Sequence, residues 1–120
     1  MVMLDANLIL RYLLDDNEEM AVKAEQCINE RDVAVTIEVL AEVLYVLKGV
    51  YKLERNLIVK IVKDFTELVS CSEKGVVDTA LTTYGECNLD FVDCVLYAYN
   101  RIKGIKIATF DKKLQKMLID

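Results

Sequence analysis

The chain has 120 residues, which is the size of one domain, and 54% of them are hydrophobic. Charged residues make up 29%, and the net charge is −5. A chain of this size and composition can bury a substantial core, which argues against disorder. It has no run of 18 apolar residues, and the apolar stretch after Asp5 is too short for a membrane span and follows no basic segment. We therefore expect neither a transmembrane helix nor a signal peptide, and infer a single cytoplasmic domain over residues 1–120.

The N-terminal segment combines a strand pattern with a helix pattern. Three apolar residues, Val2 to Leu4, lead into Asp5, and residues 8–14 then place apolar side chains at helical spacing. This pattern predicts a short buried strand that turns at once into a helix. Further along, apolar periodicity and turn residues predict helices over residues 18–30, 37–51, 53–68, 73–84 and 90–103, strands over 33–36, 69–71 and 105–110, a loop over 85–88, and a short closing helix.

Strands that alternate with helices are typical of parallel pairing, because a crossover connection is needed to bring the chain back in the same direction. We therefore predict a three-layer α/β/α domain with a small central parallel sheet. The helix over residues 73–84 is expected to bury the apolar side chains of Val76, Val77, Ala80, Leu81 and Tyr84.

Histidine is absent from the chain, and no two of the four cysteines are separated by just two residues, as in a Cys-x-x-Cys motif. Both facts argue against a structural zinc site and against nucleophilic catalysis by a Cys–His or Ser–His arrangement. If the protein is an enzyme, its chemistry therefore rests on carboxylates. Carboxylates without histidine or clustered cysteine favour a hard cation such as Mg²⁺ or Mn²⁺.

Four acidic residues stand out against the predicted elements. Asp5 follows the first expected strand and Asp111 follows the last, and ligands of parallel sheets bind beyond the carboxyl ends of the strands. Glu42 and Asp93 lie in helical stretches that are apolar on almost every face. A carboxylate in such a place is costly unless it is paired or binds a metal ion.

Three of these acids also have a purely structural explanation. Asp5 is a favoured N-cap residue for the helix that follows it. Glu42 can lie on an exposed stripe with Glu38, and Asp93 can complete a capping box with Asp90. Four acids in such settings by coincidence, on one small domain, are less common than one shared metal site. We therefore predict a shared site.

Charge is unevenly distributed along the chain. An overall excess of acid would by itself argue against nucleic acid as a partner, but residues 101–120 carry a balance of +4. A basic C-terminal segment on an acidic body suits a nuclease with an acidic metal site and a basic rim. The alternative is a set of solvated lysines on a surface helix. The six basic residues are Arg101, Lys103, Lys106, Lys112, Lys113 and Lys116.

The chain resembles PIN-domain proteins, and in particular the VapC-type toxin ribonucleases. The resemblance rests on four segments in the family's order and spacing, which together span essentially the whole chain: Leu4–Asn7, Ala41–Leu47, Asp90–Ala98 and Ala108–Asp111. It implies a Mg²⁺- or Mn²⁺-dependent endoribonuclease that cleaves RNA phosphodiester bonds, usually the dimeric toxin of a type II toxin–antitoxin pair. The low positive charge of the chain departs from the family's pattern.

Carried over residue by residue, the resemblance assigns roles to named positions. The family's acidic quartet falls on Asp5, Glu42, Asp93 and Asp111, which we expect to be both catalytic and metal-binding. Further positions are expected to support them: Asp90 as an additional metal ligand, Asn7 and Thr109 as polar neighbours of the site, and Arg11, Lys112 and Lys113 as RNA contacts. A cation held by these acids would activate water and would screen the site from an anionic substrate.

Two other classes of function fit parts of this pattern. A non-catalytic PIN-fold module that binds nucleic acid or another protein would keep the fold without the reaction. A haloacid-dehalogenase-like phosphatase also begins with an aspartate at a strand end. That family needs a second aspartate two residues later, where this chain has Asn7.

Apolar residues are more abundant than one core of this size needs, which indicates interaction surfaces. We expect a homodimer, and an antitoxin segment that packs near the first and third helices. The candidate residues for these surfaces are Leu10, Leu13, Leu14, Tyr45, Leu47 and Val50.

Overall fold

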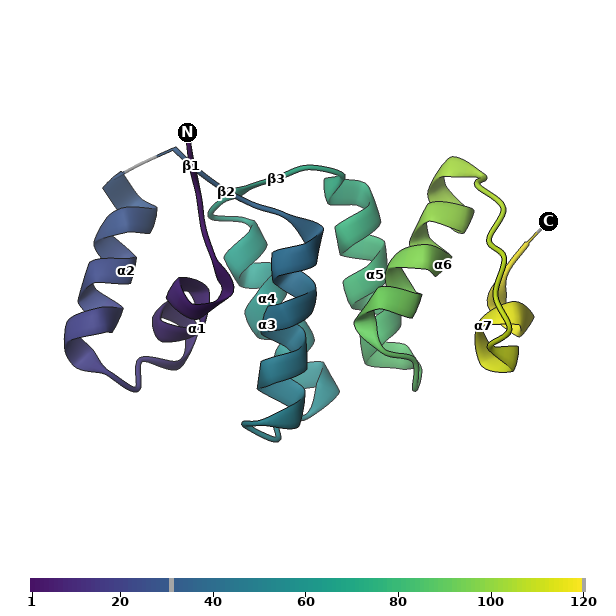
Figure 1. The fold of residues 1–120 in the computed structure, drawn as a ribbon, viewed down its shortest axis with the longest axis horizontal. Helices are drawn as coiled ribbons and strands as arrows, with labels where there is room; N and C mark the ends of the chain where they lie inside the picture. The colour runs from purple at the N-terminus through teal and green to yellow at the C-terminus, as the bar shows by residue number, and fades with distance from the viewer. Residues whose placement is uncertain (31, 120) are drawn as a thin grey trace. The chain divides into compact units, whose positions relative to one another are not determined.

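The computed structural model describes residues 1–30 and 32–119, which form two compact units, Met1–Ser72 and Glu73–Asp120 (Figure 1). The first contains β1 (Val2–Met3), α1 (Ala6–Leu14), α2 (Glu18–Glu30), β2 (Val33–Val35), α3 (Ile37–Gly49), α4 (Arg55–Thr66) and β3 (Ser70–Cys71). The second contains α5 (Lys74–Glu86), α6 (Phe91–Lys103) and α7 (Lys112–Met117).

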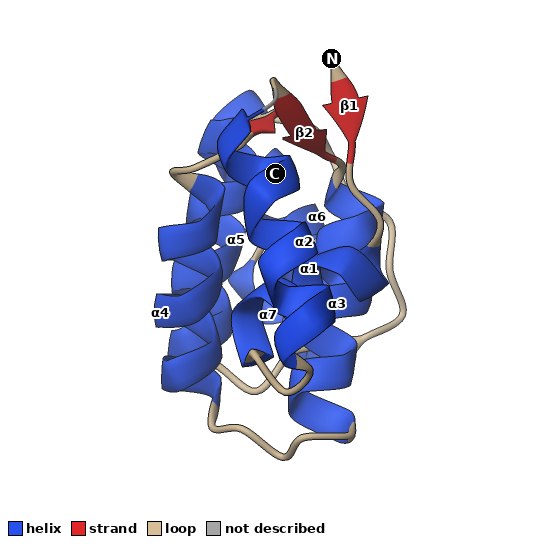
Figure 2. Ribbon diagram, turned by 90° about the vertical axis from the view of Figure 1, so that its left-hand side faces the viewer, coloured by secondary structure: helices blue, strands red, loops and turns tan. Residues whose placement is uncertain are grey.

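A three-stranded parallel sheet in the order β1-β2-β3 belongs to the first unit. In its register, Val2 lies opposite Val33, and Val35 lies opposite Cys71. Helices connect the strands, as parallel pairing requires. The short strands lie together at one end of the helices α1 to α4 (Figure 2). The predicted parallel sheet is therefore present, with strands of only two or three residues.

Helix packing forms most of the first unit's core. Helix α1 packs against α2 and α3, and α3 packs against α4. The rings of Tyr12 on α1 and Phe65 on α4 have their centroids 6.0 Å apart. Burying each large apolar side chain contributes about 1.5–3 kcal/mol. The largest fully buried side chains of this unit are Ile9, Leu40, Leu44, Leu47, Ile58, Val43, Val62 and Phe65.

Helices α5 and α6 pack against each other and form the body of the second unit. The five apolar residues predicted to be buried in the helix over 73–84 are all buried. Tyr84 meets Phe91 edge to face, with ring centroids 6.3 Å apart. Helix α6 ends where predicted, because Gly104 adopts the left-handed conformation (φ 68°) that suits a residue just past a helix.

The strand predicted over residues 105–110 is wrong. These residues belong to no strand in the described part of the chain. The side-chain amide of Asn100 instead donates hydrogen bonds to the carbonyl oxygens of Ile105 (3.0 Å) and Ile119 (2.7 Å), and its oxygen accepts one from the Ile119 N–H (2.9 Å). A buried side chain thus supplies some of the backbone bonds that a neighbouring strand would have supplied.

Two further sequence predictions need correction. The loop predicted over residues 85–88 begins later, because α5 continues through Glu86 and the Cys87 N–H still bonds to the Thr83 carbonyl at 3.0 Å. Among the candidate surface residues, Leu10 and Leu47 are buried in the core, because they lie on the inner faces of α1 and α3.

The other candidates for an interaction surface differ in how exposed their side chains are. Tyr45 is 76% exposed and Val50 is 66% exposed, whereas Leu13 and Leu14 are half-buried.

Within residues 1–30 and 32–119, every helix is too short or too polar to cross a bilayer.

Candidate functional site

Asp5 is the N-cap of α1, in an extended conformation (φ −94°, ψ 170°). Its Oδ1 accepts a hydrogen bond from the Leu8 N–H at 2.9 Å, and the side chain is exposed. The structural explanation considered for Asp5 is therefore correct. It does not exclude a second role, because a carboxylate has four acceptor sites and the cap uses one of them.

A pocket of about 310 Å³ lies beside Asp5 and is also lined by Asn7, Arg11 and Lys23. The guanidinium of Arg11 bonds to both carboxylate oxygens of Asp16, at 2.8 and 2.9 Å. This ion pair raises the pKa of Arg11 and lowers the pKa of Asp16, in both cases mainly through the hydrogen bonds. The positive charge of Arg11 is thus already shared with a carboxylate within its own unit.

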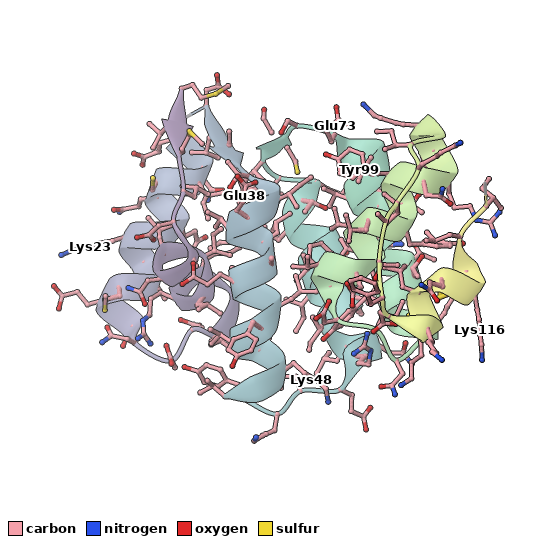
Figure 3. All side chains as sticks on the ribbon, turned by 45° about the vertical axis from the view of Figure 1, so that its right-hand side comes forward. Lys23, Glu38, Lys48, Glu73, Tyr99 and Lys116 are labelled. Atoms are coloured by element: carbon pink, nitrogen blue, oxygen red, sulfur yellow. The ribbon has the colours of Figure 1, made fainter. Side chains whose placement is uncertain are left out.

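Glu42 is exposed on α3, as is Glu38 one turn earlier (Figure 3). The prediction that the helix is buried on almost every face is wrong, because Glu38, Glu42 and Tyr45 form an exposed stripe along it. Glu42 therefore needs no metal ion to be tolerated at its position. Its proposed role rests on the family pattern and not on burial.

The second unit holds three aspartates in related settings. Asp90 is the N-cap of α6, and its Oδ1 accepts a hydrogen bond from the Asp93 N–H at 2.9 Å. Asp111 is the N-cap of α7, and its Oδ1 accepts one from the Leu114 N–H at 2.8 Å. The Asp111 N–H in turn donates to the hydroxyl of Thr109 at 3.0 Å. Thr109 therefore contacts Asp111, as expected of a polar neighbour.

A pocket of about 410 Å³ brings these three aspartates together. Asp93 is half-buried, and burial is the largest cause that raises its pKa above the ordinary value. The negative charges of Asp90 and Asp111 raise it further. Ionisation of Asp93 is therefore unfavourable in this pocket, and a bound cation would relieve the repulsion between the carboxylates. The lining residues are Asn88, Leu89, Asp90, Asp93, Asp111, Lys112 and Lys113.

Asn88 is a site residue that the sequence did not single out. Only its position, two residues before the N-cap Asp90, could have indicated that it lines this pocket. Lys112 and Lys113 were expected near the site, and both line the pocket beside Asp111. They belong to the basic C-terminal segment, from which Lys116 extends away from α7 (Figure 3).

The donor atoms of the pocket fit a hard divalent cation, because they are carboxylate oxygens and the chain has no histidine. In the described residues, no three acidic or sulfur side chains are grouped closely enough to hold a metal ion as they stand. The three aspartates supply the chemistry of a Mg²⁺ or Mn²⁺ site but not a closed ligand shell.

Comparison with known protein families gives a match over almost the whole chain. The family model for the PIN domain matches residues 2–118. The chain belongs to the PIN-domain family. No curated protein and no solved structure matches the chain.

Membership of the PIN family confirms the predicted resemblance to PIN-domain proteins and the predicted fold class, a three-layer α/β/α domain with a small parallel sheet. PIN domains are typically nucleases, hence hydrolases that bind nucleic acid, and they generally use divalent metal ions. The acidic pocket of the second unit therefore lies in a chain whose family performs metal-assisted chemistry on nucleic acids.

Proposed function

We propose that the protein is a metal-dependent endoribonuclease and the toxin of a type II toxin–antitoxin pair. The observation that carries the proposal is the pocket in which Asp90, Asp93 and Asp111 lie beside Lys112 and Lys113. Carboxylates that repel one another attract a divalent cation, and adjacent lysines attract phosphate. That combination suits hydrolysis of a phosphodiester, and the PIN family gives the reaction class.

The acids expected to hold Mg²⁺ or Mn²⁺ are Asp5, Glu42, Asp90, Asp93 and Asp111. A bound ion would supply an activated water molecule and would neutralise charge on the attacked phosphate.

The chain's own bonds orient the aspartates. In Asp5, Asp90 and Asp111, one carboxylate oxygen caps a helix, which fixes the side chain and leaves the other oxygen for binding. Thr109 fixes the backbone at Asp111 by accepting its N–H.

The basic and amide side chains of the site are proposed to contact the substrate. Lys112 and Lys113 stand beside the acidic pocket and would bind phosphates that flank the cleaved bond. Arg11 would contribute through the part of its guanidinium that Asp16 does not occupy. Asn7 lies in the pocket beside Asp5 and would hydrogen-bond the substrate or a water molecule.

Incubation of the purified protein with labelled single-stranded RNA tests the reaction. We expect cleavage with Mn²⁺ or Mg²⁺, no cleavage in EDTA, and recovery when Mn²⁺ is restored in excess. Glu25→Gln, which removes an exposed acid on α2, is the matched control and should cleave like the wild type. Undiminished cleavage in EDTA would contradict the metal dependence, and no cleavage with either metal would favour the non-catalytic module.

The proposed partners are a second copy of the chain and an antitoxin protein. Support comes from the exposed apolar side chains at the C-terminal end of α3, Tyr45 and Val50 (76% and 66% exposed), with Tyr51 beside them (39%). A small reading frame that overlaps the upstream end of the gene would identify the antitoxin.

Light scattering of the isolated protein should give the mass of a homodimer at micromolar concentration. Tyr45→Lys should shift the mass toward the monomer, because it places a charge in an apolar contact. Leu57→Lys, at an exposed apolar position on α4, is the control and should remain dimeric. A monomer mass for the wild type would count against the proposed dimer.

A further inference from the structure

Phe110 is the most exposed large apolar side chain in the described residues, at 101% of its reference area. An aromatic ring in this position adds nothing to the core and presents both faces to solvent. Single exposed apolar residues are common on protein surfaces. The position of Phe110 and the way its backbone is held distinguish it from such residues.

The backbone on both sides of Phe110 is fixed by hydrogen bonds. On one side, the Thr109 carbonyl accepts a hydrogen bond from the side-chain amide of Gln115. On the other, the Asp111 N–H donates to the Thr109 hydroxyl, and the Asp111 carboxylate caps α7 through the Leu114 N–H. The ring is therefore carried by an ordered stretch of backbone, so that less conformational entropy is lost when it binds a flat partner.

Phe110 directly precedes, in the sequence, three residues that line the acidic pocket. Asp111, the next residue, lines that pocket together with Lys112 and Lys113, and consecutive Cα atoms are about 3.8 Å apart. The ring is followed by three charged residues and not by the contiguous apolar surface typical of a protein contact. An aromatic face next to cationic side chains matches a nucleotide, which pairs a flat base with a phosphate.

We propose that Phe110 is a stacking platform for one unpaired base of the RNA, next to the phosphate that the acidic pocket receives. The inference rests on the function proposed for that pocket and adds the side chain that holds one base of the single-stranded substrate. Bases in a duplex are covered on both faces by their neighbours, whereas unpaired bases are open to stack on aromatic side chains.

A tryptophan at position 110 tests the stacking directly. The chain has no tryptophan, so Phe110→Trp gives a protein with a single indole fluorophore. In an Asp93→Asn background, which keeps the RNA intact, single-stranded oligoadenylate should quench this fluorescence to saturation. The matched control is Ile102→Trp in the same background, at an exposed position on α6 nine residues, or about 14 Å, beyond Asp93. Its fluorescence should not change.

Affinity supplies the second readout. Binding of labelled oligoadenylate, followed by fluorescence anisotropy, should weaken about 5- to 150-fold for Phe110→Ala, which is the range expected for loss of one stacked base. Phe110→Tyr keeps the aromatic face and should bind like the unmodified chain. Because the ring is exposed, Phe110→Ala should leave the melting temperature unchanged.

These readouts do not depend on cleavage, so they separate the two proposals. If the wild type cleaves no RNA but Phe110→Trp is quenched selectively, the stacking inference stands and the proposed reaction fails. Equal quenching of the two tryptophan variants, equal quenching by a duplex, or unchanged affinity in Phe110→Ala would overturn the inference. Tighter binding of single-stranded DNA than of RNA would overturn the substrate class.

Discussion

Asp93→Asn is expected to lower Mn²⁺-dependent RNA cleavage at least about 100-fold, while the folded chain in EDTA stays as stable as the wild type or becomes more stable. Changing a partner of a metal ligand typically reduces activity 10- to 100-fold, and losing a ligand should cost at least as much. The stability gain follows from charge, because Asp93 is half-buried and lies close to the charges of Asp90 and Asp111.

The sign of the stability effect can be checked against pH. In the folded chain the pKa of Asp93 is raised, first by burial and then by its two acidic neighbours. Ionised Asp93 therefore opposes folding at pH values above its folded pKa, and protonation removes the penalty at pH values below the unfolded pKa. Asp93→Asn should raise the melting temperature in EDTA by up to a few degrees at neutral pH, and this difference should disappear as the solution is acidified.

Thermal melts in EDTA and in Mn²⁺ measure both parts of this expectation. The wild type should gain stability from Mn²⁺, whereas Asp93→Asn should gain little, because it lacks one carboxylate. Asp64→Asn, at an exposed acid on α4, is the control and should match the wild type in melting and in cleavage. A variant at position 93 that melts far below the wild type in EDTA would assign Asp93 a structural role instead.

Local signals predicted most of the secondary structure, because they depend on nearby residues alone. Periodicity placed the helices, and Asp5 caps α1 as its position before an apolar helix suggested. The error at residues 105–110 has a different origin. Alternating apolar residues there fit a strand, but a strand also needs a partner, and Asn100 occupies part of that backbone instead.

The sequence named Asp93 and Asp111 as candidate site residues, but their helical patterns did not show that they would lie near each other. Asp93 and Asp111 are separated by seventeen residues, and the packing of α7 on α6 brings them to one pocket. Sequence similarity could pair them, whereas helical periodicity could not. Glu42 was expected to be buried because its neighbours are apolar, but nine apolar-rich residues of helix still leave one face exposed. A sequence shows which residues are apolar, and only tertiary packing determines which faces are covered.

Helix capping and metal binding are alternative explanations for an aspartate in the sequence, but the observed geometry allows one side chain to do both. Asp5, Asp90 and Asp111 each use one oxygen to accept a backbone N–H, which leaves the other oxygen available. The N-terminal end of a helix also favours a negative side chain. A capping aspartate is thus held in one orientation without any metal ion, which reduces the entropy lost when an ion binds.

The double variant Asp5→Asn, Asp93→Asn is expected to cleave RNA no more slowly than the slower of the two single variants. Our proposal assigns Asp5 and Asp93 to one reaction. Residues that act as one catalytic set are strongly non-additive, because loss of the first already removes the contribution that the second depends on. Each single variant should lose at least about 100-fold in rate.

Single-turnover cleavage in saturating Mn²⁺ measures the cycle of wild type, two single variants and double variant. Independent contributions would multiply, so the double variant would then fall about 10⁴-fold below the wild type. That result would contradict one shared reaction centre. Pairing Asp93→Asn with Asp64→Asn provides the control cycle, since the exposed acid on α4 should add nothing to the loss. A double variant that cleaves as fast as the slower single variant would support the proposal that Asp5 and Asp93 serve the same reaction.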